Sequence, residues 1–309
     1  MIENQKAIAV LGNVTLDIIC KTVDDVPRYD SIAFQEAAVT PGGCGSNTAL
    51  GLAGQGERVY LIACTGTDAA AEILFQNWEK MGVKTRFVQQ FKNLGSGISV
   101  GLVDSDYQPR FIHTPGANTE LRKDSLKTDL LTEHEVQFFH VAGFFVLPGL
   151  LDLDFAEVLC QAQRSGLYTT LDVVTSPAMK NAEFLWPLLP CLNVFMCNLK
   201  EAEILTGSGD PDSASSVFHN RGASVVIIKL GSEGCWLSEA GQGVHIPAPQ
   251  VEKVIDTTGA GDAFAAGLLA ALRKGEDLPA ACRAGVLLGS RTVQFLGAVK
   301  FPEDNSENR

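Results

Sequence analysis

Near its carboxyl end the 309-residue chain reads Asp256-Thr257-Thr258-Gly259-Ala260-Gly261-Asp262-Ala263-Phe264. A segment rich in Ala and Leu follows at helical spacing, to about Arg273. Small residues at the start of a helix leave backbone N–H groups open, and the helix dipole adds partial positive charge there. The stretch therefore predicts a seat for a phosphate, with Asp262 placed to take a proton from an attacking hydroxyl. The alternative is an ordinary turn in which the aspartate caps the helix.

Strand-like and helix-like segments alternate along most of the chain. The strand patterns cover residues 7–11, 58–64, 136–141, 168–173, 194–197 and 224–230. The helix patterns between and after them cover residues 46–54, 69–81, 155–164, 201–205, 263–273 and 279–295. Alternating helices and apolar strands predict an α/β fold with a parallel sheet covered on both faces. Ligands of such sheets bind beyond the carboxyl ends of the strands.

Two stretches break this alternation, residues 31–40 and 97–114. Both carry strand patterns, and the second has turn residues but no helix between its strands. They predict a small antiparallel sheet that protrudes from the main body as a lid and excludes water from a cleft; a pair of edge hairpins is the alternative. We expect one domain over residues 1–309, with linker-like segments at 207–216 and in the tail 302–309.

Composition limits the possible partners and the compartment. A net charge of -12 argues against nucleic acid or an anionic membrane as the main partner. The eight cysteines form no CxxC pair, which predicts reduced, mostly buried thiols in a cytoplasmic protein. The amino-terminal residues carry no basic leader, and no run of 18 apolar residues occurs, so we expect neither a signal peptide nor a membrane span.

A glycine-rich cluster lies where the first lid segment returns to the main body. It reads Pro41-Gly42-Gly43-Cys44-Gly45-Ser46-Asn47. Paired glycines allow unusual backbone angles and close approach of the backbone to a ligand, so they are a candidate hinge. Asn47 can both donate and accept hydrogen bonds, which suits a polyhydroxylated ligand. A loop without a ligand is the alternative.

Three motifs occur together in a characteristic order: Gly42-Gly43 with Asn47, then Asn198-Leu199-Lys200-Glu201, then the stretch from Asp256 to Asp262. This order resembles the ribokinase-like (PfkB) carbohydrate kinase family, over about residues 6 to 302. The resemblance implies a Rossmann-like α/β/α sandwich with a small β-sheet lid. It also implies ATP-dependent phosphorylation of a hydroxyl of a sugar or nucleoside, with Mg²⁺ and ATP as cofactors. A monovalent cation is a further candidate cofactor, and we expect a homodimer that associates through the lid.

The same resemblance assigns the residues of the transfer site. Asp262 resembles the catalytic base of the family, and the anion hole corresponds to Gly259, Ala260 and Gly261. Asn198 and Glu201 resemble the pair that helps to hold magnesium and phosphates, with Glu201 acting on Mg²⁺ through water. For Glu201 the alternative is an acid in the first turn of a helix, favoured by the helix dipole.

The nucleotide site of the family corresponds to the end of the long strand and the turn after it, with Lys229, Gly231 and Gly234. Many members carry Thr or Ser where this chain has Lys229. This lysine is therefore either a phosphate contact or a solvated residue at the strand end.

On the acceptor side, Asp17 resembles the hydroxyl-binding aspartate of the family, and Gly42, Gly43 and Asn47 would lie beside it. A carboxylate can accept from two adjacent hydroxyls; a surface aspartate after a strand is the alternative. Ribokinases usually carry Asn in place of Thr15 and a Glu in the region that here reads Gly143-Phe144-Phe145-Val146. That apolar region is more similar to adenosine kinases, whereas Pro115-Gly116-Ala117-Asn118 is similar to ribokinases.

The acceptor class therefore stays open. We interpret the chain as a sugar kinase, with a nucleoside kinase as the alternative. A non-catalytic sugar-binding regulatory protein is the alternative from another class, and the intact Asp262 argues against it, because a binder needs no base.

Overall fold

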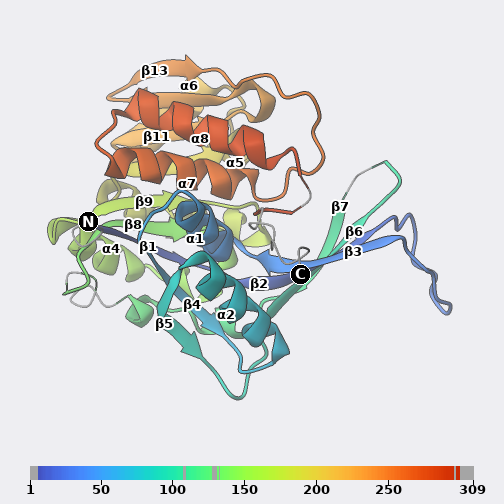
Figure 1. The fold of residues 1–309 in the computed structure, drawn as a ribbon. Helices are drawn as coiled ribbons and strands as arrows, with labels where there is room; N and C mark the ends of the chain where they lie inside the picture. The colour runs from blue at the N-terminus through green and yellow to red at the C-terminus, as the bar shows by residue number, and fades with distance from the viewer. Residues whose placement is uncertain (1–5, 107–108, 127–130, 132, 296, 300–309) are drawn as a thin grey trace.

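The computed structural model of the chain describes residues 6–106, 109–126, 131, 133–295 and 297–299. These residues form a nine-stranded sheet and a separate four-stranded sheet. Helices cover both faces of the larger sheet, and the smaller sheet projects from its side (Figure 1). The predicted Rossmann-like α/β/α sandwich with a small β-sheet lid is confirmed.

The larger sheet is mostly parallel. In spatial order its strands are β13 (Gln242–Ile246), β12 (Cys235–Glu239), β11 (Val225–Lys229), β10 (Val194–Asn198), β9 (Tyr168–Asp172), β8 (Val136–Ala142), β1 (Ala7–Gly12), β4 (Val59–Thr65) and β5 (Lys84–Gln90). Only β12 and β13 run antiparallel to their neighbours. Alternate residues of β1 enter different cores: Ala9 and Leu11 pack on one face, Ile8 and Val10 on the other. Burial on both faces explains why these strands read as continuous apolar runs.

The helices divide between the two faces according to the cores that they share with the strands. One face carries α1 (Cys44–Gly54), α2 (Ala69–Met81), α7 (Ala260–Arg273) and α8 (Leu278–Thr292). The other carries α4 (Phe155–Arg164), α5 (Leu199–Thr206) and α6 (Pro211–Asn220). Short 3₁₀ helices complete the connections: η1 (Gly116–Glu120), η2 (Lys123–Ser125), η3 (Phe144–Val146), η4 (Pro148–Leu150), η5 (Pro177–Lys180), η6 (Ala182–Phe184), η7 (Trp186–Cys191) and η8 (Gly231–Glu233).

Helix α6 corrects one expectation. Residues 207–216 were expected to be a linker, but the helix begins at Pro211 within them. Asp210 caps the helix by accepting a hydrogen bond from the Ser213 N–H. Pro211 suits the first helical position because it has no N–H, and an N–H at that position would have no partner within the helix. The tail 302–309 lies outside the described residues.

The smaller sheet, called the lid below, has the strand order β3 (Glu36–Gly42), β2 (Thr15–Lys21), β6 (Gly97–Val103) and β7 (Pro109–Thr114). Strand β2 was not expected, and residues 31–35 belong to no strand. Because β2 pairs parallel with β6 and antiparallel with β3, the sheet is mixed, and the expectation of an antiparallel sheet was wrong. The second sheet forms because the chain leaves β1 at Gly12 and re-enters a strand at Thr15 without a helix between.

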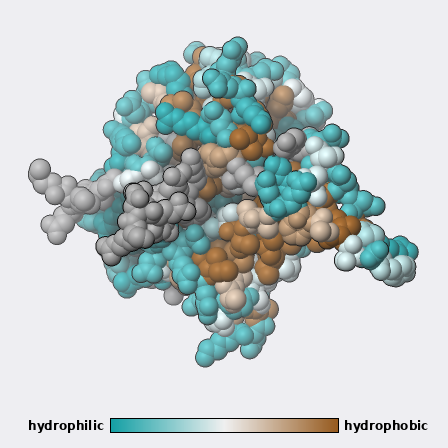
Figure 2. Space-filling model, turned by 45° about the vertical axis from the view of Figure 1, so that its right-hand side comes forward, coloured by the Kyte–Doolittle hydropathy of each residue, from teal (hydrophilic) through white to brown (hydrophobic). Residues whose placement is uncertain are grey.

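The two faces of the lid differ in character. Asp17 is in register with Ser99, which pairs with His113, so these three side chains share one face. The next register row, with Val39 and Ile112 at its ends, points the other way; these two side chains are 54% and 65% exposed. Figure 2 shows a continuous hydrophobic band that extends toward the projecting end of the molecule.

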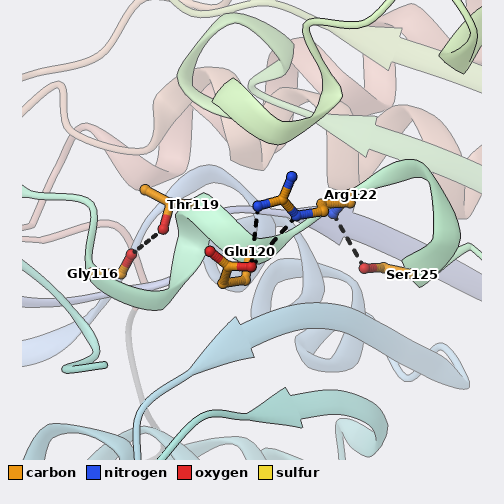
Figure 3. A network of polar contacts seen from close by, with 5 residues as sticks. All are labelled: Gly116, Thr119, Glu120, Arg122 and Ser125. Carbon is orange, nitrogen blue, oxygen red and sulfur yellow. Dashed lines mark hydrogen bonds and ion pairs between the residues drawn. The ribbon is translucent and has the colours of Figure 1, made fainter. Parts of the chain in front are cut away.

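A polar turn fixes the base of the lid where β7 returns to the main body. Asn118 of η1 donates to the Val14 carbonyl oxygen and accepts from the Val14 N–H, at 2.8 and 2.9 Å. The rest of the turn is closed by three local contacts, Thr119 to Gly116, Arg122 to Glu120, and Arg122 N–H to Ser125 (Figure 3). The lid therefore joins the main body through bonds between segments about 100 residues apart.

Two further findings concern the cysteines and the membrane. Cys160 of α4 and Cys191 of η7 form a disulfide, with 4.6 Å between their Cα atoms, so the expectation that all eight cysteines are reduced was wrong. The pair meets because α4 packs against η7. In the described part of the chain, no helix combines the length and the apolar character that a membrane crossing requires.

Candidate active site

Asp262 lies in the first turn of α7, which begins at the turn predicted to hold a phosphate. Gly259, with φ of 73°, caps this helix in the left-handed region. From α1, Asn47 Nδ2 donates to Asp262 Oδ2 at 2.8 Å. Burial raises the pKa of Asp262 to about 7, and the charge of Asp172 adds to this effect. A carboxyl group with such a pKa is well matched to proton transfer near neutral pH.

Lys229, at the end of β11, brings a positive charge to the start of α7. A Cβ atom at position 261 would lie 3.1 Å from Lys229 Nζ, so glycine at this position lets the ammonium group approach the helix. Burial opposes the charged form of Lys229, but Asp172, Glu201 and Asp262 outweigh it and raise the pKa. The lysine is therefore a permanent cation beside the first turn of α7, an arrangement that attracts phosphate oxygens.

Asp172, at the end of β9, belongs to the same charge cluster but was missed from the sequence. It is 3% exposed, and its Oδ1 accepts from the Gly143 N–H at 2.6 Å. Its Oδ2 lies 3.9 Å from Nε2 of the buried His140, whose pKa falls to about 3 through burial and the charge of Lys229. The imidazole is therefore neutral. A signal for Asp172 existed, because it is a carboxylate at the end of a parallel strand.

Asn198 and Glu201 form a capping box at the start of α5. Asn198 Oδ1 accepts from the Glu201 N–H at 2.9 Å, and Glu201 Oε2 accepts from the Asn198 N–H at 2.7 Å. The other oxygen of Glu201 accepts from the Thr175 N–H at 3.1 Å. Burial raises the pKa of Glu201, which is 2% exposed. Because both Glu201 oxygens already accept hydrogen bonds from backbone N–H groups, the residues fit a Mg²⁺ ion that is held through water and by nucleotide phosphates rather than by direct ligation. No group of three metal-binding side chains occurs among the described residues.

A first cavity of about 730 Å³ opens on one side of the α7 turn. Asn198, Lys229 and Gly261 lie at its polar end. Most of the remaining lining is apolar or glycine: Gly231, Gly234, Ala248, Pro249, Val251, Val254, Ala260, Phe264, Val286, Gly289 and Val293. An apolar cleft with a cation at one end suits a flat heterocycle joined to phosphates.

A second cavity, of about 520 Å³, lies on the other side of the same turn and under the lid. The lid contributes Asp17, Ser99 and His113, the three side chains that share one face. The main body contributes Asn47, Gly259 and Asp262, together with the apolar residues Phe145, Val146, Pro148, Leu151, Val174 and Pro177. The second cavity is called the acceptor pocket below, after the ligand that the sequence resemblance leads us to expect there.

Asp17 is held by a hydrogen bond within its own strand. Thr15 Oγ1 donates to Asp17 Oδ1 at 2.6 Å, and burial raises the pKa of Asp17 to about 6. A Cβ atom at position 42 would overlap the Asp17 carboxylate, so the neighbouring strand needs glycine there. Gly42 therefore acts through Asp17, whereas Gly43, which begins α1, lines the acceptor pocket itself.

The sequence-predicted residues thus fall into two groups that meet at the turn from Thr258 to Asp262. Asp17, Gly43, Asn47, Gly259 and Asp262 line the acceptor pocket. The first cavity is lined by Asn198, Lys229, Gly231, Gly234, Ala260 and Gly261. Glu201 lines neither cavity and contacts the site through Asn198. The two cavities therefore meet at this turn, which contributes residues to both.

Comparison with known proteins gives the family. The model of the pfkB family carbohydrate kinases matches residues 5–305. Ribokinase of Mus musculus is 29% identical over 275 residues, or 86% of this chain and 81% of that protein. The 2-dehydro-3-deoxygluconokinase of Bacillus subtilis is 27% identical over 82% of this chain and 81% of that protein. A structure of Arabidopsis thaliana ribokinase complexed with ribose and ATP superposes with a TM-score of 0.82 at 24% identity, covering 94% of each chain. The chain belongs to the pfkB family of carbohydrate kinases, which are ATP-dependent phosphotransferases with an alcohol acceptor.

Proposed function

We propose that the protein transfers the γ-phosphoryl group of ATP to a hydroxyl of a sugar or sugar-like molecule, and that residues 1–309 act as one kinase domain. The observation that supports this most strongly is the meeting of the two cavities at one helix start, with Asp262 on the acceptor side. Asp262 takes the proton of the acceptor hydroxyl, and Asn47 holds the carboxylate toward it. The N–H groups of residues 259–261 form the anion hole.

The nucleotide is held in the first cavity. Gly231 and Gly234 line this cavity, and because they have no side chains they leave room for the nucleotide. Lys229 pairs with the phosphate that is transferred. Asn198 and Glu201 would hold Mg²⁺ through water, and the bound ion would neutralise phosphate charge. A monovalent cation is proposed as an activator at the Asp256 loop, whose carboxylate accepts from Thr258 and Gly297 N–H groups at 2.9 Å. Turnover measured with and without K⁺ tests that activator.

The direct test is release of ADP from Mg-ATP in the presence of pentoses, hexoses, sugar acids and nucleosides, one at a time. We expect acceptor-dependent turnover that is lost in Asp262→Asn. Turnover restricted to nucleosides would narrow the sugar-like acceptor to a nucleoside and leave the proposed phosphoryl transfer intact. Tight binding of a sugar without any turnover would instead favour the regulatory sugar-binding protein and contradict the proposed function.

Substitution of Asp17 by alanine should raise the acceptor KM by ~10- to 100-fold and leave the ATP KM nearly unchanged. Loss of a charge-assisted hydrogen bond typically costs about 1.5–3 kcal/mol, and the lid row of Asp17 faces only the acceptor pocket. Asp104→Ala, in the turn after β6, is the matched control. A rise in ATP KM with an unchanged acceptor KM would mean that the two sites are reversed.

Lid closure is expected when the acceptor binds. Residues 36–42, 97–103 and 109–114 should gain protection from hydrogen exchange with acceptor, beyond the protection that nucleotide alone gives. The proposed hinge is Gly42-Gly43, where Gly43 has φ of 83°. The same protection with nucleotide alone would show that these strands do not respond to the acceptor.

We also propose a homodimer through the outer face of the lid, because its register row from Val39 to Ile112 is apolar and exposed. Ile112→Glu should convert the dimer to a monomer in light scattering. Val244→Glu is the control, because Val244 is similarly exposed, at 46%, on β13 of the other sheet. A monomeric wild-type protein, or a dimer that survives Ile112→Glu, would contradict this interface.

A further inference from the structure

The acceptor pocket carries negative but no permanent positive charge. Its described lining residues include two carboxylates, Asp17 and Asp262, and no lysine or arginine. A ligand carboxylate or phosphate in this pocket would face like charges without a cationic partner. Burying an unpaired charge is costly, and two acidic groups nearby increase that cost.

Basic residues on the lid and in the segment that follows it are paired with other groups. Arg122, whose Cγ lies near the η4 wall, donates to Glu120 at 3.2 Å (Figure 3). Lys123 pairs with Asp154 at 2.7 Å. On the lid, Arg110 donates to the carbonyl oxygens of residues 23 and 24, at 3.0 and 2.8 Å. Among the described residues, these three cations are therefore paired with other groups, and none of them lines the pocket.

The walls of the pocket differ in polarity. One wall, from residues 13–17 and 43–47 with Asp262, presents carboxylates, amides and hydroxyls. The opposite wall comes from η3, η4 and the segment after β9, and presents Phe145, Val146, Leu151 and Val174. Ser176 Oγ fixes this wall by donating to the Phe145 carbonyl oxygen at 2.8 Å. One part of the pocket therefore matches sugar hydroxyls, and the other matches an apolar or aromatic ring.

The size of the pocket supports the same conclusion. Its volume of about 520 Å³ lies within the ~300–1,000 Å³ typical of sites that enclose drug-sized ligands. A pentose is smaller than a drug-sized ligand, so a glycoside that carries a second ring matches this volume better.

We infer that the acceptor is an uncharged glycoside with a ring aglycone, of the nucleoside class, and neither a sugar acid nor a sugar phosphate. This inference rests on the proposed kinase function and names its substrate class. The sugar lies against the polar wall, with one hydroxyl at Asp262 and others at Asp17. The aglycone lies against Val146 and Leu151.

The first test compares kcat/KM with Mg-ATP for inosine, adenosine, uridine, ribose, 2-dehydro-3-deoxygluconate and fructose 6-phosphate. We expect kcat/KM for the best nucleoside to exceed kcat/KM for ribose and for both anionic acceptors by at least ~10-fold. The reason is that a substrate with an apolar group that fits its pocket is typically preferred by roughly 10- to 200-fold over one that lacks the group.

A pair of leucines supplies a matched test of the apolar wall. Leu151 lines the pocket, whereas Leu153, 57% exposed, does not. Leu151→Lys should lower kcat/KM for the nucleoside at least ~10-fold and reduce the ratio of nucleoside to sugar-acid kcat/KM. The ATP KM should stay unchanged. Leu153→Lys, the control, should change none of these quantities. Should Leu151→Lys fold poorly, Leu151→Ala should reduce the ratio of nucleoside to ribose kcat/KM.

The outcomes separate the inference from the proposed function. Turnover in which ribose or an anionic acceptor equals or exceeds every nucleoside overturns the inference and leaves the kinase intact. An absence of turnover with every acceptor overturns the proposed function. Thermal-shift titration then decides the inference, which requires stabilisation by a nucleoside at concentrations where ribose and the sugar acid have no effect.

Discussion

Asp262→Asn should lower kcat by ~10²–10⁴-fold while ATP binds within a few-fold of its normal affinity. The reason is that in the proposed mechanism the carboxylate contacts the acceptor hydroxyl and not the ground state of the nucleotide, so its loss should affect the chemical step. Single-turnover rates and equilibrium titration with ATP separate the two quantities. Asp277→Asn is the matched control, since Asp277 caps α8 and lines neither ligand cavity. An Asp262→Asn enzyme that keeps more than half of the normal kcat would remove Asp262 from the mechanism.

The same carboxylate predicts the pH dependence of turnover. Its pKa is raised to about 7 by burial and by the charge of Asp172, so the proton is bound below about pH 7 and the base is then inactive. Turnover should therefore fall as pH decreases through 7, approaching tenfold per pH unit, and level off above it. This fall of kcat at low pH, called the acid limb below, should be absent from the residual activity of Asp262→Asn. A kcat that is flat from pH 8 to pH 5 would contradict this assignment.

Lys229→Met should lower kcat by ~10²–10³-fold, the usual cost of removing one group that stabilises transition-state charge. Methionine is unbranched and one atom shorter than lysine, so the packing beside Gly261 is largely preserved while the positive charge is lost. The three carboxylates that raise the lysine pKa then lack their cation, and the acid limb of kcat should move to higher pH. The measurement is kcat as a function of pH at saturating ATP.

Lys92→Met, in the exposed turn after β5, is the control for loss of one positive charge. A Lys229→Met enzyme with kcat within about threefold of normal and the same acid limb would show that the lysine is a structural residue, because a transition-state contact cannot be that dispensable.

Local sequence predicted the elements whose signals are local. Helix α2 spans Ala69–Met81 as expected, because Asp68 accepts from the Ala71 N–H and Gly82 ends the helix in the left-handed region. The turn before α7 was also found, since its small residues and its two aspartates are contiguous. The division of the chain into a main body and a projecting second sheet could be predicted from the break in alternation.

The elements that sequence could not supply depend on distant contacts. Strand β2 forms a second sheet because the chain turns at Asn13-Val14, and that turn is held by Asn118, 104 residues further on. The charge cluster around Lys229 depends on β9, β10 and β11 lying side by side, which sets Asn198 opposite Lys229. Local sequence patterns do not predict such a register between strands. They also gave no sign that Cys160 would form a disulfide with Cys191.

The turn from Thr258 to Asp262 separates the two cavities and is shared by both, whereas the apolar wall of the acceptor pocket comes from η3, η4 and the segment after β9. The wall residues belong to neither the turn nor the strand of Lys229, so we expect their substitution to leave the residues proposed for phosphoryl transfer in place. A protein lineage can therefore change its acceptor preference while it keeps the same phosphoryl-transfer chemistry. A collection of such proteins should vary most in the lining around Val146 and Leu151, and engineered changes of acceptor should start there.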